Sequence, residues 1–535
     1  MAKLNLKEGL ILGDGARSLI IEKVTNELIY VRGSQGGNPL RYIPVQLINY
    51  LVDAINKNEI SIQDISRKYR SDNQLPHLFD ALKLNLDKYI LGYDSTIQKI
   101  CEYILENPYL NTDESGLYKA NSMPKPFLLL AGISGTGKTR FVREQAKASQ
   151  QLNETYCLTS VRPDWHEPSD LLGYISRLSR GGQAEYITTD VLQFIAKAWR
   201  GIADKGLTIE VQNSSAEGAR LVVVGERAAL NAVLPYWLCL DEMNLAPVEQ
   251  YFADYLSVLE TREWHWDGDA FIYHCDALLK PATINAVGST DQLKADLGFE
   301  LPKYDGLWQL ICDYGLAIPF NLMVAGTVNM DETTHGFSRK VIDRALSFDF
   351  GAFFPNDFDE FFVPTSVNKP LSYPICSQAR AVDLTHTCDA GGVKTRAFLA
   401  AVNTVLKNTP FELAYRALNE LLLAVVSSQP QDEPTLYAVW DDFLMCKVLP
   451  RIEGDSDKLS TSAGGALLPE LQQVLGVHLS LIWAGIQRPD LYRERIIATD
   501  AAEANKIIRI ACRSKAKLEW MQQRLERATF TSFWP

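Results

Sequence analysis

The sequence predicts an α/β protein built around a parallel β-sheet, with a small α+β domain before the sheet and a helical region after it. Two observations carry this prediction. Short, continuous apolar runs alternate with longer helical patterns between residues 82 and 350, and a glycine-rich loop directly follows one of these runs. Continuous apolar runs are typical of strands that are buried on both faces, as the strands of parallel sheets are.

Residues 1–80 are expected to form the small N-terminal domain. The stretch SLIIEKVTNELIYVRGS at 18–34 has the pattern of two strands joined at Thr25-Asn26. Pro44 then precedes apolar residues at helical spacing, which predicts a helix that begins there.

Residues 81–355 are expected to hold the sheet, with the runs FLLLA, WLCL and NLMVAGTV as its strands. Two long segments of mixed pattern, 176–235 and 264–318, are interpreted as insertions on the loops of the sheet. Residues 356–535 show mainly helical periodicity and are expected to form a C-terminal helical domain and tail. The predicted last helix places three apolar residues on one face: Leu518, Met521 and Leu525.

The composition excludes several classes of protein. A formal net charge of −12 over 535 residues argues against nucleic-acid binding by the whole surface, so any such contact must be local. Nine cysteines occur without a CxxC pair, which argues against a disulfide framework or a zinc module and favours thiols in a reducing compartment. The N-terminus has no apolar signal-peptide core, and no apolar run has the length of a membrane span, so we expect a cytoplasmic protein without membrane contact.

The glycine-rich loop GISGTGKT at 132–139 fits the phosphate-binding pattern G-x-x-x-x-G-K-[ST] at every fixed position. An apolar run precedes it and a helical pattern follows, which is the context that this loop requires. Lys138 is expected to reach the β- and γ-phosphates of a nucleotide, and Thr139 to ligate Mg²⁺. The residues expected to bind the nucleotide here are Gly132, Ser134, Gly135, Thr136, Gly137, Lys138, Thr139 and Arg140.

Polar residues follow two further apolar runs. Asp241 and Glu242 end the run WLCLDE, where Asp241 would hold the Mg²⁺ shell and Glu242 would accept a proton from the attacking water. Asn329 ends the run MVAGTVN and would orient water or the γ-phosphate beside them. The competing interpretation is a solvated strand end for the two acids and a turn residue for Asn329.

An arginine is the fourth signal along the chain. Arg344 lies just before the strand-like LSFDF and is the candidate finger that acts on the γ-phosphate of a neighbouring subunit, with Arg339 in reserve. The alternative is a surface salt bridge between Arg344 and Asp343.

Taken in this order, the motifs resemble the AAA+ fold, and in detail its McrB-like branch, the motor subunits of McrBC-type restriction systems. The segments that carry the resemblance are VRPDWHEPSDLLGY at 161–174, LDEMNLAPVEQYFADYLSVLE at 240–260 and GTVNMDETTHGFSRKVIDRA at 326–345, with YRALNE, KVLPRIEG and TSFWP matched more loosely. The resemblance implies a helical lid carrying a sensor arginine, Arg416, that would contact nucleotide. It also implies a homo-oligomeric ring, expected to be a hexamer, and a separate McrC-like nuclease subunit.

The resemblance leaves the nucleotide open between GTP and ATP. McrB-like proteins are known for using GTP, and their signature after the sensor strand reads M-N-x-x-D-R. Here Glu332 and Thr333 replace its last two residues, and the chain has no N-K-x-D sequence for reading guanine.

Two further points concern the nuclease and the DNA with which the protein would work. No Asp or Glu is followed two residues later by Lys, so a PD-(D/E)xK nuclease is not expected within the chain. The resemblance implies that the N-terminal domain contacts DNA, although solvated strand faces explain its basic residues at least as well. A protein-remodelling chaperone of the MoxR type, which would not depend on DNA, stays as the alternative function.

Overall fold

The computed structural model describes residues 120–178, 184–214, 218–330, 336–496 and 503–534, together with four strands nearer the N-terminus. The chain divides into two compact units, and each is described by itself. One unit comprises Met1–Lys119 and Ile497–Asn505, and the other comprises Ala120–Ile496 and Lys506–Pro535.

The strands described near the N-terminus, in the first unit, form an antiparallel sheet of four strands in chain order. Its strands are β1 (Ile11–Leu12), β2 (Leu19–Val24), β3 (Leu28–Gly33) and β4 (Arg41–Pro44). Strands β2 and β3 pair across the segment that contains Thr25-Asn26, which confirms the two strands predicted there. The helix expected after Pro44 and the domain boundary expected at residue 80 lie outside the described residues.

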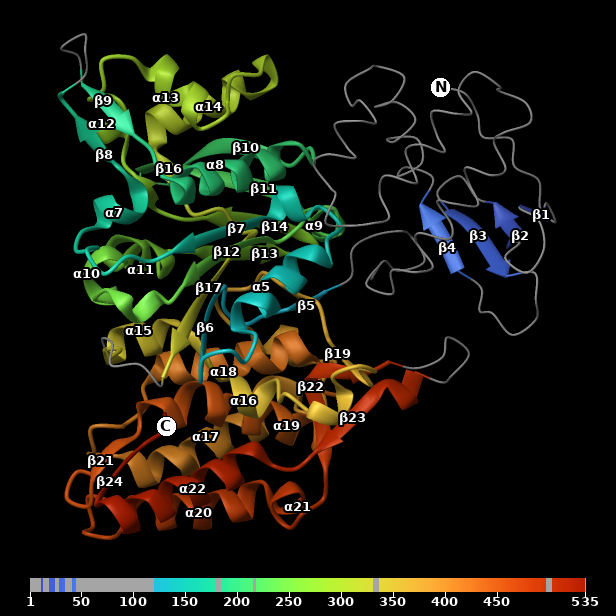
Figure 1. Cartoon of the computed structure of the whole chain (residues 1–535), viewed down its shortest axis with the longest axis vertical. Helices are drawn as coiled ribbons and strands as arrows, with labels where there is room; N and C mark the ends of the chain where they lie inside the picture. The colour runs from blue at the N-terminus through green and yellow to red at the C-terminus, as the bar shows by residue number, and fades with distance from the viewer. Residues whose placement is uncertain are drawn as a thin grey trace. The chain divides into compact units, whose positions relative to one another are not determined.

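The centre of the second unit is a parallel sheet of five strands in the order β18-β6-β17-β12-β7 (Figure 1). The strands are β6 (Phe127–Gly132), β7 (Tyr156–Ser160), β12 (Tyr236–Asp241), β17 (Leu322–Asn329) and β18 (Leu346–Asp349). Every residue of β6 and β17 is buried, as their continuous apolar runs predict for a sheet covered on both faces. The parallel α/β core is therefore confirmed.

Two helices that contact the sheet connect its strands. Helix α5 (Lys138–Lys147) follows β6 and contacts β12 and β17, and helix α8 (Asp190–Ala203) contacts β7 and β12. Thr189 caps the start of α8, because its hydroxyl accepts a hydrogen bond from the backbone N–H of Leu192. Because α8 links two parallel strands, it is a crossover helix and not part of an insertion, although it falls within 176–235.

Strands from both predicted insertions pair in one further sheet. Its antiparallel strands, in the order β10-β11-β14-β13, come in equal numbers from 176–235 and 264–318. They are β10 (Thr208–Ser214), β11 (Gly218–Glu226), β13 (Glu263–Asp267) and β14 (Ala270–His274). Trp264 and Phe271 of this sheet pack against Phe320, which lies just before β17, so the second sheet is attached to the first through aromatic contacts.

The C-terminal region is mainly helical, as predicted. Its longer helices are α17 (Val393–Leu406), α18 (Tyr415–Ser428), α19 (Glu433–Phe443), α20 (Leu467–His478) and α22 (Arg513–Ala528). Leu518 and Met521 of α22 are buried and Leu525 packs against the core, which confirms the apolar face expected of the last helix. A small antiparallel sheet in the order β19-β22-β23 was not predicted; its strands are β19 (Ser366–Asn368), β22 (Arg488–Arg495) and β23 (Ile507–Ile510).

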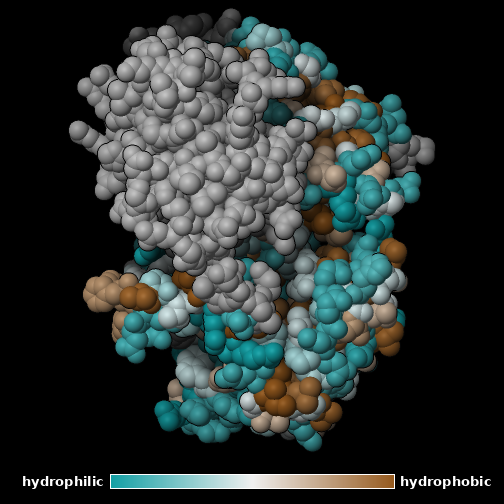
Figure 2. Space-filling model, turned by 90° about the vertical axis from the view of Figure 1, so that its right-hand side faces the viewer, coloured by the Kyte–Doolittle hydropathy of each residue, from teal (hydrophilic) through white to brown (hydrophobic). Residues whose placement is uncertain are grey.

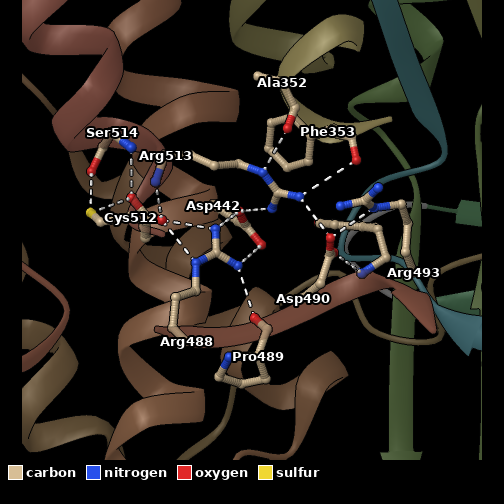
Figure 3. A network of polar contacts seen from close by, with 12 residues as sticks. Ala352, Phe353, Asp442, Arg488, Pro489, Asp490, Arg493, Cys512, Arg513 and Ser514 are labelled. Carbon is tan, nitrogen blue, oxygen red and sulfur yellow. Dashed lines mark hydrogen bonds and ion pairs between the residues drawn. The ribbon is translucent and has the colours of Figure 1, made fainter. Parts of the chain in front are cut away.

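A buried ionic network joins this region to the end of the parallel sheet (Figure 3). Arg488 is fully buried and pairs with Asp441 at 2.8 Å and with Asp442. Arg513 pairs with Asp442 at 2.8 Å and donates to the backbone carbonyl of Ala352, in the short helix α16 (Phe350–Phe353) that follows β18. Buried charges are tolerated only when they are paired in this way.

Replacing Arg488 by methionine is expected to lower the free energy of unfolding by about 3–5 kcal/mol, because Asp441 and Asp442 would stay buried without their shared cation. The measurement is urea unfolding followed by circular dichroism. Arg227→Met is the matched control, since Arg227 lies outside the network and pairs with Asp269 at 3.4 Å on the exposed surface. Equal midpoints for the two variants would contradict a structural role of the network.

The surface of the described part is mixed. Figure 2 shows hydrophilic residues interspersed with small hydrophobic patches over the coloured part of one face. The exposed apolar side chains that follow one another most closely are Phe358, Phe361, Phe362 and Val363. No helix within the described ranges is long and apolar enough to cross a membrane.

Candidate functional site

The glycine-rich loop connects the end of β6 to the start of α5, where sequence reasoning placed it. Gly135 has φ 78° and Gly137 has φ 92°, a backbone conformation that residues with a Cβ rarely adopt. A Cβ at either position would meet nothing within 4 Å, so backbone conformation and not crowding requires glycine here. The loop thus presents open space at the N-terminus of α5, where backbone N–H groups attract anions.

Lys138 is the buried cation of this loop. Its ammonium donates hydrogen bonds to the carbonyl oxygens of Gly132 at 3.1 Å and Ile133 at 2.7 Å. The hydroxyl of Thr136 also donates to the carbonyl of Ile133, at 2.9 Å, and so closes the loop on itself. Ser134 and Arg140 are exposed, Arg140 in the first turn of α5.

Asp241 and Thr139 are in direct contact. Oδ1 of Asp241 accepts hydrogen bonds from the hydroxyls of Thr139 at 2.6 Å and Thr327 at 2.7 Å. Thr327 lies in β17, and sequence reasoning did not identify it. The sequence feature that could have identified Thr327 is the two-residue period of a strand, which places Thr327 on the same face as Asn329.

Glu242 is held in an uncommon backbone conformation directly after β12. Its φ of 53° and ψ of 50° lie in the left-handed region, which a residue other than glycine occupies only when its surroundings enforce it. The N–H of Glu242 donates to the hydroxyl of Thr327 at 2.9 Å, and its Oε1 accepts from Nδ2 of Asn329 at 3.1 Å. Thr327 and Asn329 therefore fix both the backbone and the carboxylate of Glu242.

The sheet order explains why these side chains meet. Strand β17 lies between β6 and β12, with Asn329 in register with Gly132 and Gly326 in register with Leu240. Because all three strands are parallel, their carboxyl ends share one edge of the sheet. The structure thus brings together the loop, Asp241, Glu242 and Asn329, as expected.

The oxygen ligands at this edge suit Mg²⁺. A hydroxyl and a carboxylate are hard oxygen donors, and Mg²⁺ is usually bound by one or two such groups together with phosphate oxygens. Within the described ranges, no group of three or more His, Cys, Asp or Glu side chains could hold a metal ion by itself. Thr139 and Asp241, which are in contact, supply one hydroxyl and one carboxylate oxygen of the kind that Mg²⁺ prefers.

The candidate finger, Arg344, and the candidate sensor arginine, Arg416, lie close to each other and do not contact the phosphate-binding loop. Arg344 ends helix α15 (Arg339–Arg344) and its Nε lies 3.8 Å from Oε1 of Glu260, just after α11 (Ala253–Leu259). Arg416, in the first turn of α18, pairs with the other oxygen of Glu260 at 2.7 Å. Arg416 therefore lies beside Arg344. The contact with nucleotide that the resemblance implies for Arg416 stays a prediction.

Arg344 borders an open groove. The groove has a volume of about 550 Å³ and is lined by residues of α10 (Val248–Tyr251), α11 and α15, among them Arg339 and Lys340. Asp343, the alternative partner of Arg344, pairs instead with Arg451 at 3.2 Å. Arg339 donates to the carbonyl of Pro410 at 2.6 Å and lies over the ring of Phe411.

The altered signature residues Glu332 and Thr333 lie outside the described residues. Residues 380–530, which include most of the C-terminal helical region, match a family described as a domain of unknown function (DUF8727). No curated protein matches the chain.

Proposed function

We propose that the chain is an AAA+ nucleoside triphosphate hydrolase. The observation that carries the proposal is the junction of Thr139, Asp241, Glu242 and Asn329 at one edge of the parallel sheet, next to the phosphate-binding loop. Each of the four residues has the chemistry that its proposed role requires. Both GTP and ATP are candidate substrates.

In the proposed mechanism, the loop amides and Lys138 bind the phosphates of the nucleotide. Thr139 and Asp241 would hold Mg²⁺, which neutralises phosphate charge when it is bound. Glu242 accepts the proton of the attacking water, and Asn329 orients the carboxylate through the bond to Oε1. Thr327 joins the two acids, because its hydroxyl donates to Asp241 and accepts from the backbone of Glu242.

The position of Arg344 supports assembly into a ring. Its polar partners belong to α15 and to Glu260, and its side chain borders a surface groove. A guanidinium in this position suits the γ-phosphate of a neighbouring subunit, where it would stabilise the charge of the transition state. Because Arg416 shares the same carboxylate, we assign it to the same surface. A hexamer is the ring that the sequence resemblance implies.

We further propose that this motor belongs to a McrBC-like restriction or anti-phage defence complex with a separate nuclease subunit. The support is the sequence resemblance of 161–174, 240–260 and 326–345 to the McrB-like branch. DNA contact is assigned to the N-terminal domain on the same basis.

DNA dependence tests this assignment. Double-stranded DNA is expected to raise nucleotide turnover of the full chain severalfold, because a DNA-driven motor couples hydrolysis to its target. Phosphate release is measured with plasmid DNA, with an unfolded protein, and with neither. Stimulation by the unfolded protein and none by DNA would favour the MoxR-like chaperone instead.

A further inference from the structure

A cluster of three charges, two of them buried and one largely buried, lies at the C-terminal end of α15. Lys125 lies just before β6, Glu420 belongs to α18, and Lys447 belongs to the π-helical turn η7 (Leu444–Val448). Lys447 pairs with Glu420 at 2.9 Å, and Lys125 pairs with the other carboxylate oxygen. The side chains of Glu420 and Lys447 are 5% and 6% exposed, so solvent screens this pair little.

Both lysines bind the backbone that carries Arg344. The ammonium of Lys447 donates to the carbonyl oxygens of Asp343 at 2.7 Å and Ala345 at 2.9 Å. The ammonium of Lys125 donates to the carbonyl of Asp343 at 3.0 Å. The last carbonyls of a helix have no partner within the helix, and cations are favoured there. The two lysines, which come from different elements of the fold, thus hold the end of α15 in place.

Helix α15 needs such external support. It has six residues, far fewer than a helix requires for stability by itself. The position of Arg344, its last residue, therefore depends on the groups that bind the end of the helix. Glu420 is the only carboxylate among the described residues that pairs with both lysines, so it holds them against these carbonyls.

The electrostatic state of the cluster agrees with this role. Burial lowers the pKa of Lys125 to about 8, with Lys447 adding to the shift and Glu420 opposing it. Burial also acts to raise the pKa of Glu420, but Lys447 and Lys125 outweigh it, so its pKa lies below the usual value. Glu420 is therefore charged near neutral pH and is the anion that makes two neighbouring buried ammonium groups tolerable.

We infer that Glu420 is a positioning residue for the arginine finger: through Lys125 and Lys447 it couples helix α18 to the end of α15 and so to Arg344. This inference rests on the proposed function. Glu420 lies four residues after Arg416 on the same helix, one turn away. A shift of α18 would therefore move Arg416 directly and Arg344 through the cluster.

The test uses Glu420→Gln, which keeps the size of the side chain and removes its charge. Turnover at saturating nucleotide is expected to fall at least about 10-fold, while the KM and the directly measured nucleotide affinity stay within about twofold, because the subunit's own phosphate site is intact. Glu433→Gln is the matched control, since Glu433 pairs with Lys394 at 2.7 Å on the exposed surface and has no link to α15.

Mixing with Glu242→Gln subunits separates a finger defect from a general one. A Glu242→Gln subunit has an inactive site and an intact finger, whereas a Glu420→Gln subunit is expected to have the reverse. An equimolar mixture should then regain activity at about one quarter of its sites, because each site in a ring combines two subunits. The mixture of Arg344→Ala with Glu242→Gln is the reference.

The outcomes are distinct. Activity regained in both mixtures supports the inference. Activity regained with Arg344→Ala but not with Glu420→Gln overturns the inference and leaves the proposed function in place, whereas no gain in the reference mixture contradicts the finger itself. If Glu420→Gln does not fold, Glu420→Gln with Lys447→Met keeps the net charge of the cluster, and the same mixing test decides.

Discussion

Alanine in place of Arg344 is expected to lower turnover by about 1,000- to 100,000-fold at saturating nucleotide, the range seen when an arginine finger is removed. The affinity for nucleotide should change little, because the polar partners of Arg344 are Glu260 and the carbonyl of Lys340, not the phosphate-binding loop. The measurement pairs steady-state phosphate release with binding of a fluorescent nucleotide, and with sedimentation to follow assembly.

Arg339→Ala is the control for this prediction. Arg339 borders the same groove, but it donates to the carbonyl of Pro410 and lies over Phe411, so its replacement should affect turnover far less. A larger loss of turnover in Arg339→Ala than in Arg344→Ala would identify Arg339 as the arginine finger instead. Normal turnover in both variants would show that neither arginine acts on the nucleotide of a neighbouring subunit.

Glutamine in place of Glu242 is expected to lower turnover by about 100- to 10,000-fold, the usual contribution of a general base. Glutamine keeps the length of the side chain and can still accept the hydrogen bond from Asn329, but it cannot take a proton from water. Nucleotide binding and ring assembly should therefore be retained, and the variant should trap the bound nucleotide unhydrolysed.

Glu433→Gln is the matched control for Glu242→Gln. Glu433 pairs with Lys394 at 2.7 Å on the exposed surface, outside the candidate site. The comparison is made by single-turnover hydrolysis with chromatographic separation of products. Equal rates in the two variants would show that Glu242 is not the base.

The parallel core could be predicted because a strand that is buried on both faces is a continuous apolar run in the sequence. The fully buried strands β6 and β17 are continuous apolar runs. The polar residues that end β12 and β17, Asp241 and Asn329, lie at the same edge of the sheet as the loop after β6. The predicted insertions were located correctly only in part. Local patterns do not state which distant strands pair, so the common sheet of β10, β11, β13 and β14 could not be foreseen.

Buried charges were the features that sequence reasoning missed. Strand β22, RPDLYRER, has the composition of an exposed segment, yet Arg488 in it is fully buried because Asp441 and Asp442 neutralise it. Glu420 was likewise unremarked within an apolar helix. The pairing of such residues depends on how separate elements pack, which a single sequence does not reveal.

The place of Arg416 beside Arg344 was not predicted either. Both arginines pair with the carboxylate of Glu260, just after α11. Such a long-range arrangement leaves no spacing signal in the chain. The contact with nucleotide that the resemblance to McrB-like proteins implies for Arg416 stays a prediction.

Phosphate release by the full chain with Mg²⁺ and either ATP or GTP, with Glu242→Gln as the blank, tests the central claim most directly. The account predicts turnover above the blank with at least one of the two nucleotides, and its loss when Mg²⁺ is chelated. Binding of both nucleotides without turnover above the Glu242→Gln blank would contradict hydrolysis at this site.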